Sequence, residues 1–201
     1  MLSICLTILL ACSSHSDSLA DNDPLHPVLD RMTQADCCRF EFISILESDV
    51  FESVDSTTGT ALISADDRYD ILLGPDRYLR NNEFLYSYSG ENEQVTLERI
   101  ESSAVPDETI RFITQLDQHY HIQPLSSGKY TLTRKADSGS NLPQTIILTL
   151  TESGELDCLE YIDDNGDTNR IVIAASSFQS ECDSAAFVPN FPESTEIIKL
   201  Y

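Results

Sequence analysis

Few residues of this chain have the types and spacing that catalysis or metal binding requires. The adjacent thiols of Cys37 and Cys38 could serve as nucleophiles, but an activating base is not evident near them in the sequence. Neighbouring cysteines are poor ligands for one tetrahedral ion, and Cys158 and Cys182 form no CxxC pair. The sequence has no GxSxG, P-loop or HExxH motif. We therefore expect no catalytic residues, no enzymatic activity and no cofactor.

Two further clusters contain potential metal ligands. His119-Tyr120-His121 puts two imidazoles on one strand face, but a third ligand is not evident nearby, so a packed or exposed histidine pair is expected. The run at residues 163–167 (DDNGD) resembles part of a calcium loop. Its glycine comes one ligand position too early, and Ala174 stands where the closing glutamate belongs. Asn165-Gly166 predicts a hairpin turn instead, and we expect no metal site.

The amino-terminal residues indicate export. Residues 1–11 (MLSICLTILLA) are apolar but far shorter than the roughly 20 residues of a membrane-spanning helix, which predicts a signal peptide and a periplasmic protein. Leu9-Leu10-Ala11-Cys12 resembles a lipobox, which would leave a lipidated Cys12 and a polar tether at residues 12–24. Ser18-Leu19-Ala20 fits ordinary signal cleavage as an alternative. Cleavage before Cys12 would give a protein anchored to the outer membrane, whereas cleavage after Ala20 would give a soluble one.

Composition limits the partners and the number of domains. The chain has 201 residues and a net charge of −22, which repels nucleic acid and anionic membranes. This length suits one domain with a sizeable core, at residues 25–201.

Four cysteines remain after the signal region, with three possible full pairings: Cys37, Cys38, Cys158 and Cys182. An exported protein with this even number is expected to form at least one disulfide, involving Cys182. Adjacent cysteines more often mean that one of them bonds elsewhere, although pairing both, to Cys158 and Cys182, is geometrically conceivable.

Two helices are expected among many strands. The first begins at Asp23-Pro24 and carries Leu25, Val28, Leu29 and Met32 on one face. The second begins near Pro106, with Asp107 and Glu108 in its first turn, and has Ile110, Ile113 and Leu116 on one side. Turn signals at Gly128-Lys129, Ser138-Gly139 and Asn165-Gly166 predict successive hairpins and an antiparallel sheet.

One predicted strand has an aromatic face. In residues 75–88 (PDRYLRNNEFLYSY) a polar turn separates two strands, and the second presents Phe84, Tyr86 and Tyr88 on the same side. Apolar residues alternate in the other predicted strands too. Together these strands supply more apolar side chains than two short helices can cover.

These segments, in order, resemble the outer-membrane lipoprotein carrier family (LolA) over residues 25–200. The resemblance rests on residues 40–44 (FEFIS), 59–63 (GTALI), 68–71 (RYDI), 75–88 with Gln94-Val95, 130–150, 154–173 and 187–200. It implies a mostly β (α+β) fold, in which an unclosed antiparallel β-barrel curls around an apolar cavity with a helical lid. It also implies a monomer that binds the acyl chains of lipoproteins and transfers them toward the outer membrane.

The resemblance implies specific sites and partners. The acyl-binding cavity would be lined by Phe40, Phe42, Leu62, Tyr69, Ile71, Leu79, Phe84, Tyr86, Tyr88, Val95, Ile146 and Leu148. The lid would present Leu25, Val28, Leu29, Met32, Ile110 and Ile113, with Phe84, Tyr86 and Tyr88 beneath the first helix. Partners would be acylated lipoproteins, an inner-membrane ABC complex that releases them, and an outer-membrane acceptor.

The chain departs from the family at one position that bears on the lid. Typical members have an Arg-Pro pair after the second strand, and its arginine fastens the lid; this chain has Ala65-Asp66, with Arg68 nearby. We therefore expect a lid that opens easily unless Arg68 or a disulfide substitutes. Because a lipidated Cys12 would prevent diffusion, the alternative function is an anchored acceptor, or a sensor module of the same fold that binds a partner protein.

Overall fold

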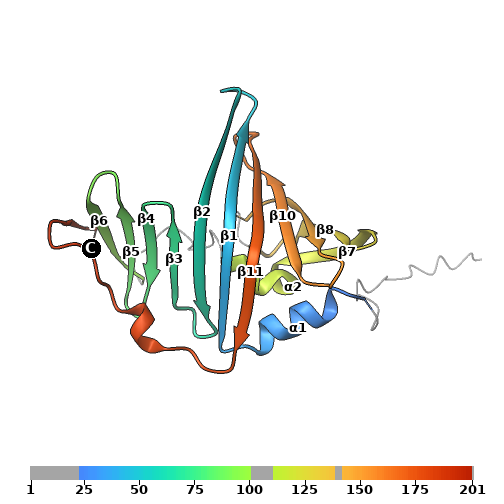
Figure 1. The fold of residues 1–201 in the computed structure, drawn as a ribbon, viewed down its shortest axis with the longest axis horizontal. Helices are drawn as coiled ribbons and strands as arrows, with labels where there is room; N and C mark the ends of the chain where they lie inside the picture. Colours follow the sequence, from blue (N-terminus) through green and yellow to red (C-terminus); the bar gives the residue numbers. More distant parts are fainter. Residues whose placement is uncertain (1–22, 101–110, 139–141, 201) are drawn as a thin grey trace, which may run out of the picture.

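The computed structural model describes residues 23–100, 111–138 and 142–200. The described residues form one 12-stranded sheet with short helices (Figure 1). The elements are α1 (His26–Gln34), β1 (Cys37–Ser48), β2 (Ser53–Ser64), β3 (Tyr69–Leu73), β4 (Asp76–Arg80), β5 (Phe84–Ser89), β6 (Gln94–Arg99), the 3₁₀ helix η1 (Arg111–Gln115), α2 (Leu116–His119), β7 (Tyr120–Ser126), β8 (Lys129–Arg134), β9 (Thr145–Leu150), β10 (Leu156–Ile162), β11 (Thr168–Gln179), the 3₁₀ helix η2 (Ser184–Phe187) and β12 (Glu196–Lys199).

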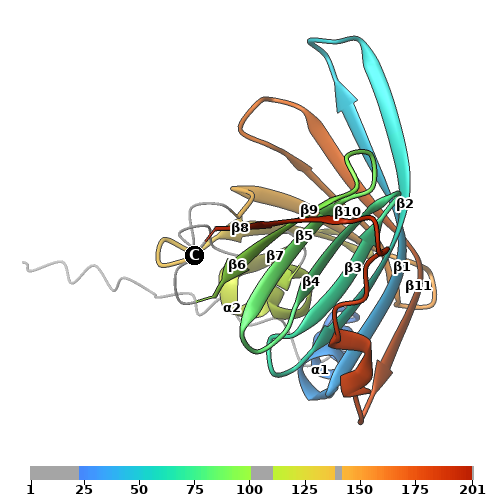
Figure 2. The same cartoon turned by 90° about the vertical axis from the view of Figure 1, so that its left-hand side faces the viewer.

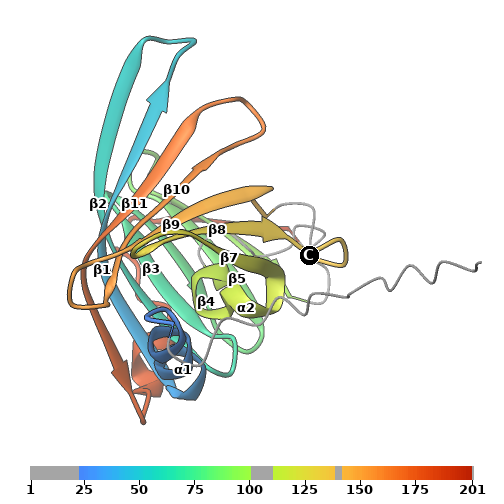
Figure 3. The same cartoon turned by 90° about the vertical axis from the view of Figure 1, so that its right-hand side faces the viewer.

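The sheet is curled but not closed. Its strand order is β12-β6-β5-β4-β3-β2-β1-β11-β10-β9-β8-β7, so β7 and β12 are edges that do not pair with each other. Strands β1, β2 and β11 form the long centre of the sheet, and its two halves curve around α1 and α2 (Figure 3). The predicted class, a mostly β unclosed barrel with helices against it, is confirmed.

The carboxyl-terminal segment departs from the predicted antiparallel pattern. Of residues 187–200, the last segment of the sequence resemblance, Glu196–Lys199 forms a strand. This strand, β12, runs parallel to β6, whereas the other described strand pairs are antiparallel. The segment before it crosses the outer side of β3 to β6 (Figure 2).

Strand registers assign each side chain to a face, because directly opposed residues point to the same side of a sheet. One row joins Phe40, Ala61, Ile71 and Tyr78 across β1 to β4. It lies on the concave face, since the neighbouring thiol of Cys38 donates to the Met32 carbonyl of α1, at 3.7 Å. The alternate row lies on the outer face and joins Arg39, Leu62, Asp70, Leu79 and Tyr86.

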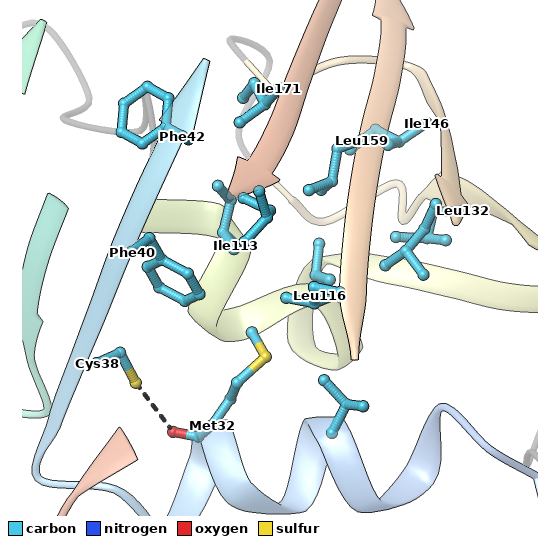
Figure 4. Close-up of a cluster of buried hydrophobic side chains, with 14 of the residues drawn as sticks. Met32, Cys38, Phe40, Phe42, Ile113, Leu116, Leu132, Ile146, Leu159 and Ile171 are labelled. Carbon is cyan, nitrogen blue, oxygen red and sulfur yellow. Dashed lines mark hydrogen bonds between the residues drawn. The ribbon is translucent and has the colours of Figure 1, made fainter. Parts of the chain in front are cut away.

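The concave face holds the main core. Phe40, Phe42 and Ile146 lie in one buried cluster with Ile113 and Leu116, which are contributed by η1 and α2 (Figure 4). Leu148 belongs to the same cluster. Gly59 makes room for the Phe42 ring, because a Cβ there would collide with the ring carbons and lie 2.8 Å from the Leu72 carbonyl oxygen.

The helical segments agree with the sequence only in part. Pro27 lies in the first turn of α1, and Asp23 Oδ1 accepts from the Leu25 amide, so this helix begins close to its predicted start. The predicted start of the second helix and Ile110 lie outside the described residues. The described part of this region consists of the five-residue 3₁₀ helix η1 and the single turn α2.

The predicted histidine pair on one strand face is wrong. His119 ends α2 and His121 lies in β7, because the strand begins at Tyr120. The predicted hairpin turn at residues 163–167 is confirmed: Gly166 has a φ of +89°, and Asp163 Oδ1 accepts from the amides of Asn165 and Asp167.

The cysteines form one disulfide among the described residues, between Cys37 and Cys182. This confirms the expected involvement of Cys182 and leaves the thiols of Cys38 and Cys158 free, so the double pairing does not occur. Cys37 and Cys38 are neighbours in β1 and point to opposite faces. In the described part of the chain no helix is long and apolar enough to span a membrane.

Candidate functional site

The residues predicted to line one cavity are divided between the two faces of the sheet. Six lie on the concave face: Phe40, Phe42, Tyr69, Ile71, Ile146 and Leu148. The other six lie on the outer face: Leu62, Leu79, Phe84, Tyr86, Tyr88 and Val95. The prediction that Phe84, Tyr86 and Tyr88 lie beneath α1 is therefore wrong. Alternation shows that side chains share a face, but the pairing of β2 to β6 decides which face it is.

The α1 helix covers the concave face. Leu25 and Val28 are fully buried and Met32 nearly so, all against the concave core, while Leu29 is half-buried at the helix edge. A helix of nine residues is marginal in water, so its stability depends on this apolar contact. The predicted lid residues of the first helix thus do lie over the sheet.

An ion pair that no local sequence signal predicted also holds α1. Arg31 Nη1 and Nη2 donate to Glu155 Oε1 and Oε2, at 3.0 and 2.8 Å, and Glu155 lies in the turn between β9 and β10. The guanidinium also lies 5.3 Å from the centroid of the Phe178 ring. Arg31 and Glu155 remain 44% and 43% exposed, so water weakens the pair.

A second polar contact holds the chain just before α1. The Tyr130 hydroxyl of β8 donates to Asp23 Oδ1 at 2.6 Å. Burial, together with the acceptor Asp23, raises the pKa of Tyr130 to about 12. The phenol therefore keeps its proton, and this contact, throughout the physiological pH range.

Arg68 does not fasten the lid. Its guanidinium pairs with Asp66 at 2.9 Å and lies 4.6 Å from the centroid of the Phe187 ring, in the carboxyl-terminal segment. That ring packs on the outer face with Leu62 and the Cys37–Cys182 disulfide. Arg68 and the disulfide, the two expected replacements for the arginine that fastens the lid, therefore both stabilise the outer face of the sheet.

The pockets beside α1 are either small or partly polar in this conformation. A pocket of about 140 Å³ lies between Met32, Cys38, Ile63 and Gln115. A larger one, of about 380 Å³, lies between α1, α2 and β7, and its lining mixes Leu29 with polar groups such as Asp30, Asp117 and His121. Ligand pockets commonly measure about 300–1,000 Å³ and are mostly apolar. A large apolar ligand would therefore reach the concave core residues only if α1 moved.

The thiol beneath α1 is not suited to nucleophilic chemistry. Cys38 is buried, and desolvation raises the pKa of its thiol from 9.0 to about 11. A nucleophilic cysteine requires a thiolate, which this environment disfavours at neutral pH.

The outer face has its own apolar layer. The Phe191 ring stacks on Tyr88, with centroids 5.5 Å apart, and lies tilted against Tyr86 at 5.9 Å. Leu79 and Val95 are buried below. A pocket of about 390 Å³ remains under the segment, lined by Tyr86, Val95, Leu97, Pro189, Phe191, Pro192, Glu193, Thr195 and Ile197.

Comparison with solved structures finds similar folds. An uncharacterised conserved protein from Thermus thermophilus is 6% identical, with a TM-score of 0.50, and the match covers 87% of this chain and 98% of that chain. A DUF1329 family protein from Desulfovibrio piger is 11% identical, with a TM-score of 0.48 and coverage of 83% and 98%. A LolA superfamily protein from Nitrosomonas europaea is 10% identical, with a TM-score of 0.44 and coverage of 82% and 97%.

These similarities concern the fold alone. No model of a protein family matches the sequence, and no curated protein matches it.

Proposed function

We propose that this protein binds the acyl chains of lipoproteins outside the cytoplasm and transfers them toward the outer membrane. The observation that carries the proposal is the cover of the concave face: α1 lies over it through the buried side chains of Leu25, Val28 and Met32. Its polar contacts with the sheet include the partly exposed Arg31–Glu155 ion pair. Displacing this helix exposes Phe40 and its neighbours, which then contact acyl chains in its place.

The energetics favour a shielded route for such cargo. Each methylene group kept out of water stabilises the complex by about 0.8 kcal/mol, so exposing a long acyl chain costs on the order of 10 kcal/mol. The loss of the Leu25, Val28 and Met32 contacts when α1 moves is offset by acyl contacts with the same core. The unclosed barrel gives the chains a way in, because β7 and β12 do not pair.

The disulfide supports a location outside the cytoplasm. The Cys37–Cys182 disulfide is typical of oxidising compartments such as the periplasm. By resemblance, the partners would be an inner-membrane ABC complex and an outer-membrane acceptor.

The Leu9-Leu10-Ala11-Cys12 sequence favours a second form of the proposal, in which lipidated Cys12 anchors the protein and makes it the acceptor. Fractionation of cells that express the wild type and Cys12→Ser separates the two forms. Membrane-bound wild type and soluble Cys12→Ser support the acceptor, whereas soluble wild type supports the shuttle.

Acyl binding is tested with a peptide carrying an N-terminal palmitoyl group and a fluorophore sensitive to polarity, titrated with the protein. The same peptide without the palmitoyl group is the matched control. We expect saturable binding of the acylated peptide alone. Equal binding of both peptides would support a protein-binding sensor module, and binding of neither would contradict acyl binding.

A further inference from the structure

We propose that the pocket under the carboxyl-terminal segment is a second binding site, which takes the single alkyl chain of an uncharged amphiphile. It lies on the outer face, whereas the proposed acyl site lies on the concave face. The side chains of Tyr86, Val95 and Leu97 form its floor, and Pro189, Phe191 and Pro192 belong to the segment above them.

The segment that covers the pocket is fixed at both ends. Arg77 Nη1 donates to the Asn190 carbonyl at 2.9 Å, and the same guanidinium is held by Asp70, at 2.7 Å. At the far end β12 pairs with β6, and the Leu200 amide donates to the Leu97 carbonyl at 3.0 Å. Residues 191–195 thus bridge the pocket between two attachments.

Size and lining suit an alkyl chain. The volume of about 390 Å³ lies at the small end of the range for ligand sites, and aromatic and aliphatic side chains predominate in the lining. Phe191 and Tyr88 stack beside the pocket, which supplies a rigid apolar wall. Burying an alkyl chain here removes its methylene groups and the pocket floor from water together.

The charge of the pocket lining disfavours an anionic head group. Glu193 is the charged residue among those lining the pocket, and the whole chain carries −22. A carboxylate or phosphate would meet like charge there, whereas an ester or alcohol would not.

Thr195 favours a head group that forms hydrogen bonds. It lines the pocket, and its Oγ1 is buried with no hydrogen-bond partner in the structure. Because threonine has more than one staggered rotamer, rotation about χ1 can turn this hydroxyl toward a ligand hydroxyl.

The strand β12 supplies a matched pair of variants. Ile197 opposes Val95 and lines the pocket, whereas Ile198 opposes Thr96 and points to the other face. Both are partly exposed, at 61% and 37%, so a glutamate at either position is compatible with folding. Circular dichroism of both variants checks this directly.

The test uses calorimetric titration with dodecanoylglycerol and with dodecanoate, whose chains are the same length. We expect the uncharged ligand to bind the wild type at least tenfold more tightly than the anion. Ile197→Glu should weaken the binding of dodecanoylglycerol at least tenfold, and Ile198→Glu should leave it unchanged. Equal affinity for the two ligands, equal effects of the two substitutions, or no binding of dodecanoylglycerol would overturn the proposal.

Discussion

Arg31 and Glu155, 124 residues apart in the sequence, form a two-bond ion pair that connects α1 to the turn between β9 and β10. Both partners are more than one-third exposed, so the pair is one that water can replace. The buried side chains of α1 supply the larger part of the attachment, and the pair adds a small, adjustable part. If α1 opens as proposed, the buried contacts account for most of the cost.

The first prediction concerns that pair. Arg31→Gln should raise the hydrogen-exchange rate of the α1 amides about two- to fivefold, since exposed pairs contribute about 0.2–1 kcal/mol. Arg170→Gln is the control, because Arg170 pairs with Glu160 and Glu47 across β10, β11 and β1 rather than with α1. Unchanged exchange in Arg31→Gln, or an equal increase in both variants, would show that the pair does not hold the helix.

The second prediction concerns the disulfide. Cys37→Ser and Cys182→Ser should each lower the free energy of unfolding by about 2–5 kcal/mol, because the bond closes a loop of 145 residues. Cys158→Ser removes a free thiol and should have a smaller effect. Urea denaturation measures all three variants. If Cys158→Ser proves the most destabilising of the three, the disulfide is not the dominant restraint.

Gly59 provides the third prediction. Gly59→Ala should destabilise the protein by about 1–3 kcal/mol, because the new methyl group collides with the Phe42 ring beside it. Replacing Phe42 by Leu removes that collision, so the double variant should lose less stability than the sum of the single changes. Strict additivity of the two losses would contradict the packing of Phe42 on Gly59.

The fourth prediction is a loss of stability at alkaline pH. The pKa of Cys38 is raised by burial from 9.0 to about 11, so below pH 9 the thiol is protonated in both the folded and unfolded states. Above pH 9 the unfolded chain releases this proton first, and the free energy of unfolding falls by about 1.4 kcal/mol per pH unit up to about pH 11. Cys38→Ala should reduce the fall between pH 8 and pH 10, measured by urea denaturation. An identical fall in both proteins would contradict the buried thiol.

Individual strands, turns and the first helix could be predicted because their signals are local, whereas the unclosed barrel was implied by the resemblance to the carrier family. Alternation identified the strand pair at residues 76–89, and the spacing of Leu25, Val28 and Met32 identified α1. Glycine and asparagine at 165–166 identified a turn that the structure contains. Each signal depends on a few neighbouring residues, whose preferences the tertiary structure did not override.

The candidate site was harder to predict because it depends on long-range pairing. The aromatic residues at 84, 86 and 88 share a face as expected, but the pairing of β2 to β6 turns them away from α1. Glu155 is an ordinary surface residue in sequence, and its contact with Arg31 depends on the curl of the sheet. The partner of Cys182 likewise depends on the course of residues 180–187, for which the cysteine count left alternatives open.

Hydrogen exchange with and without the palmitoylated peptide tests the central claim, that acyl chains take the place of α1 on the concave face. The account predicts faster exchange at His26–Gln34, because the helix is displaced, and slower exchange in β1 and β11, because acyl chains cover them. The unacylated peptide should change neither region. Saturable binding of the acylated peptide with unchanged or slower exchange in α1 would contradict the account.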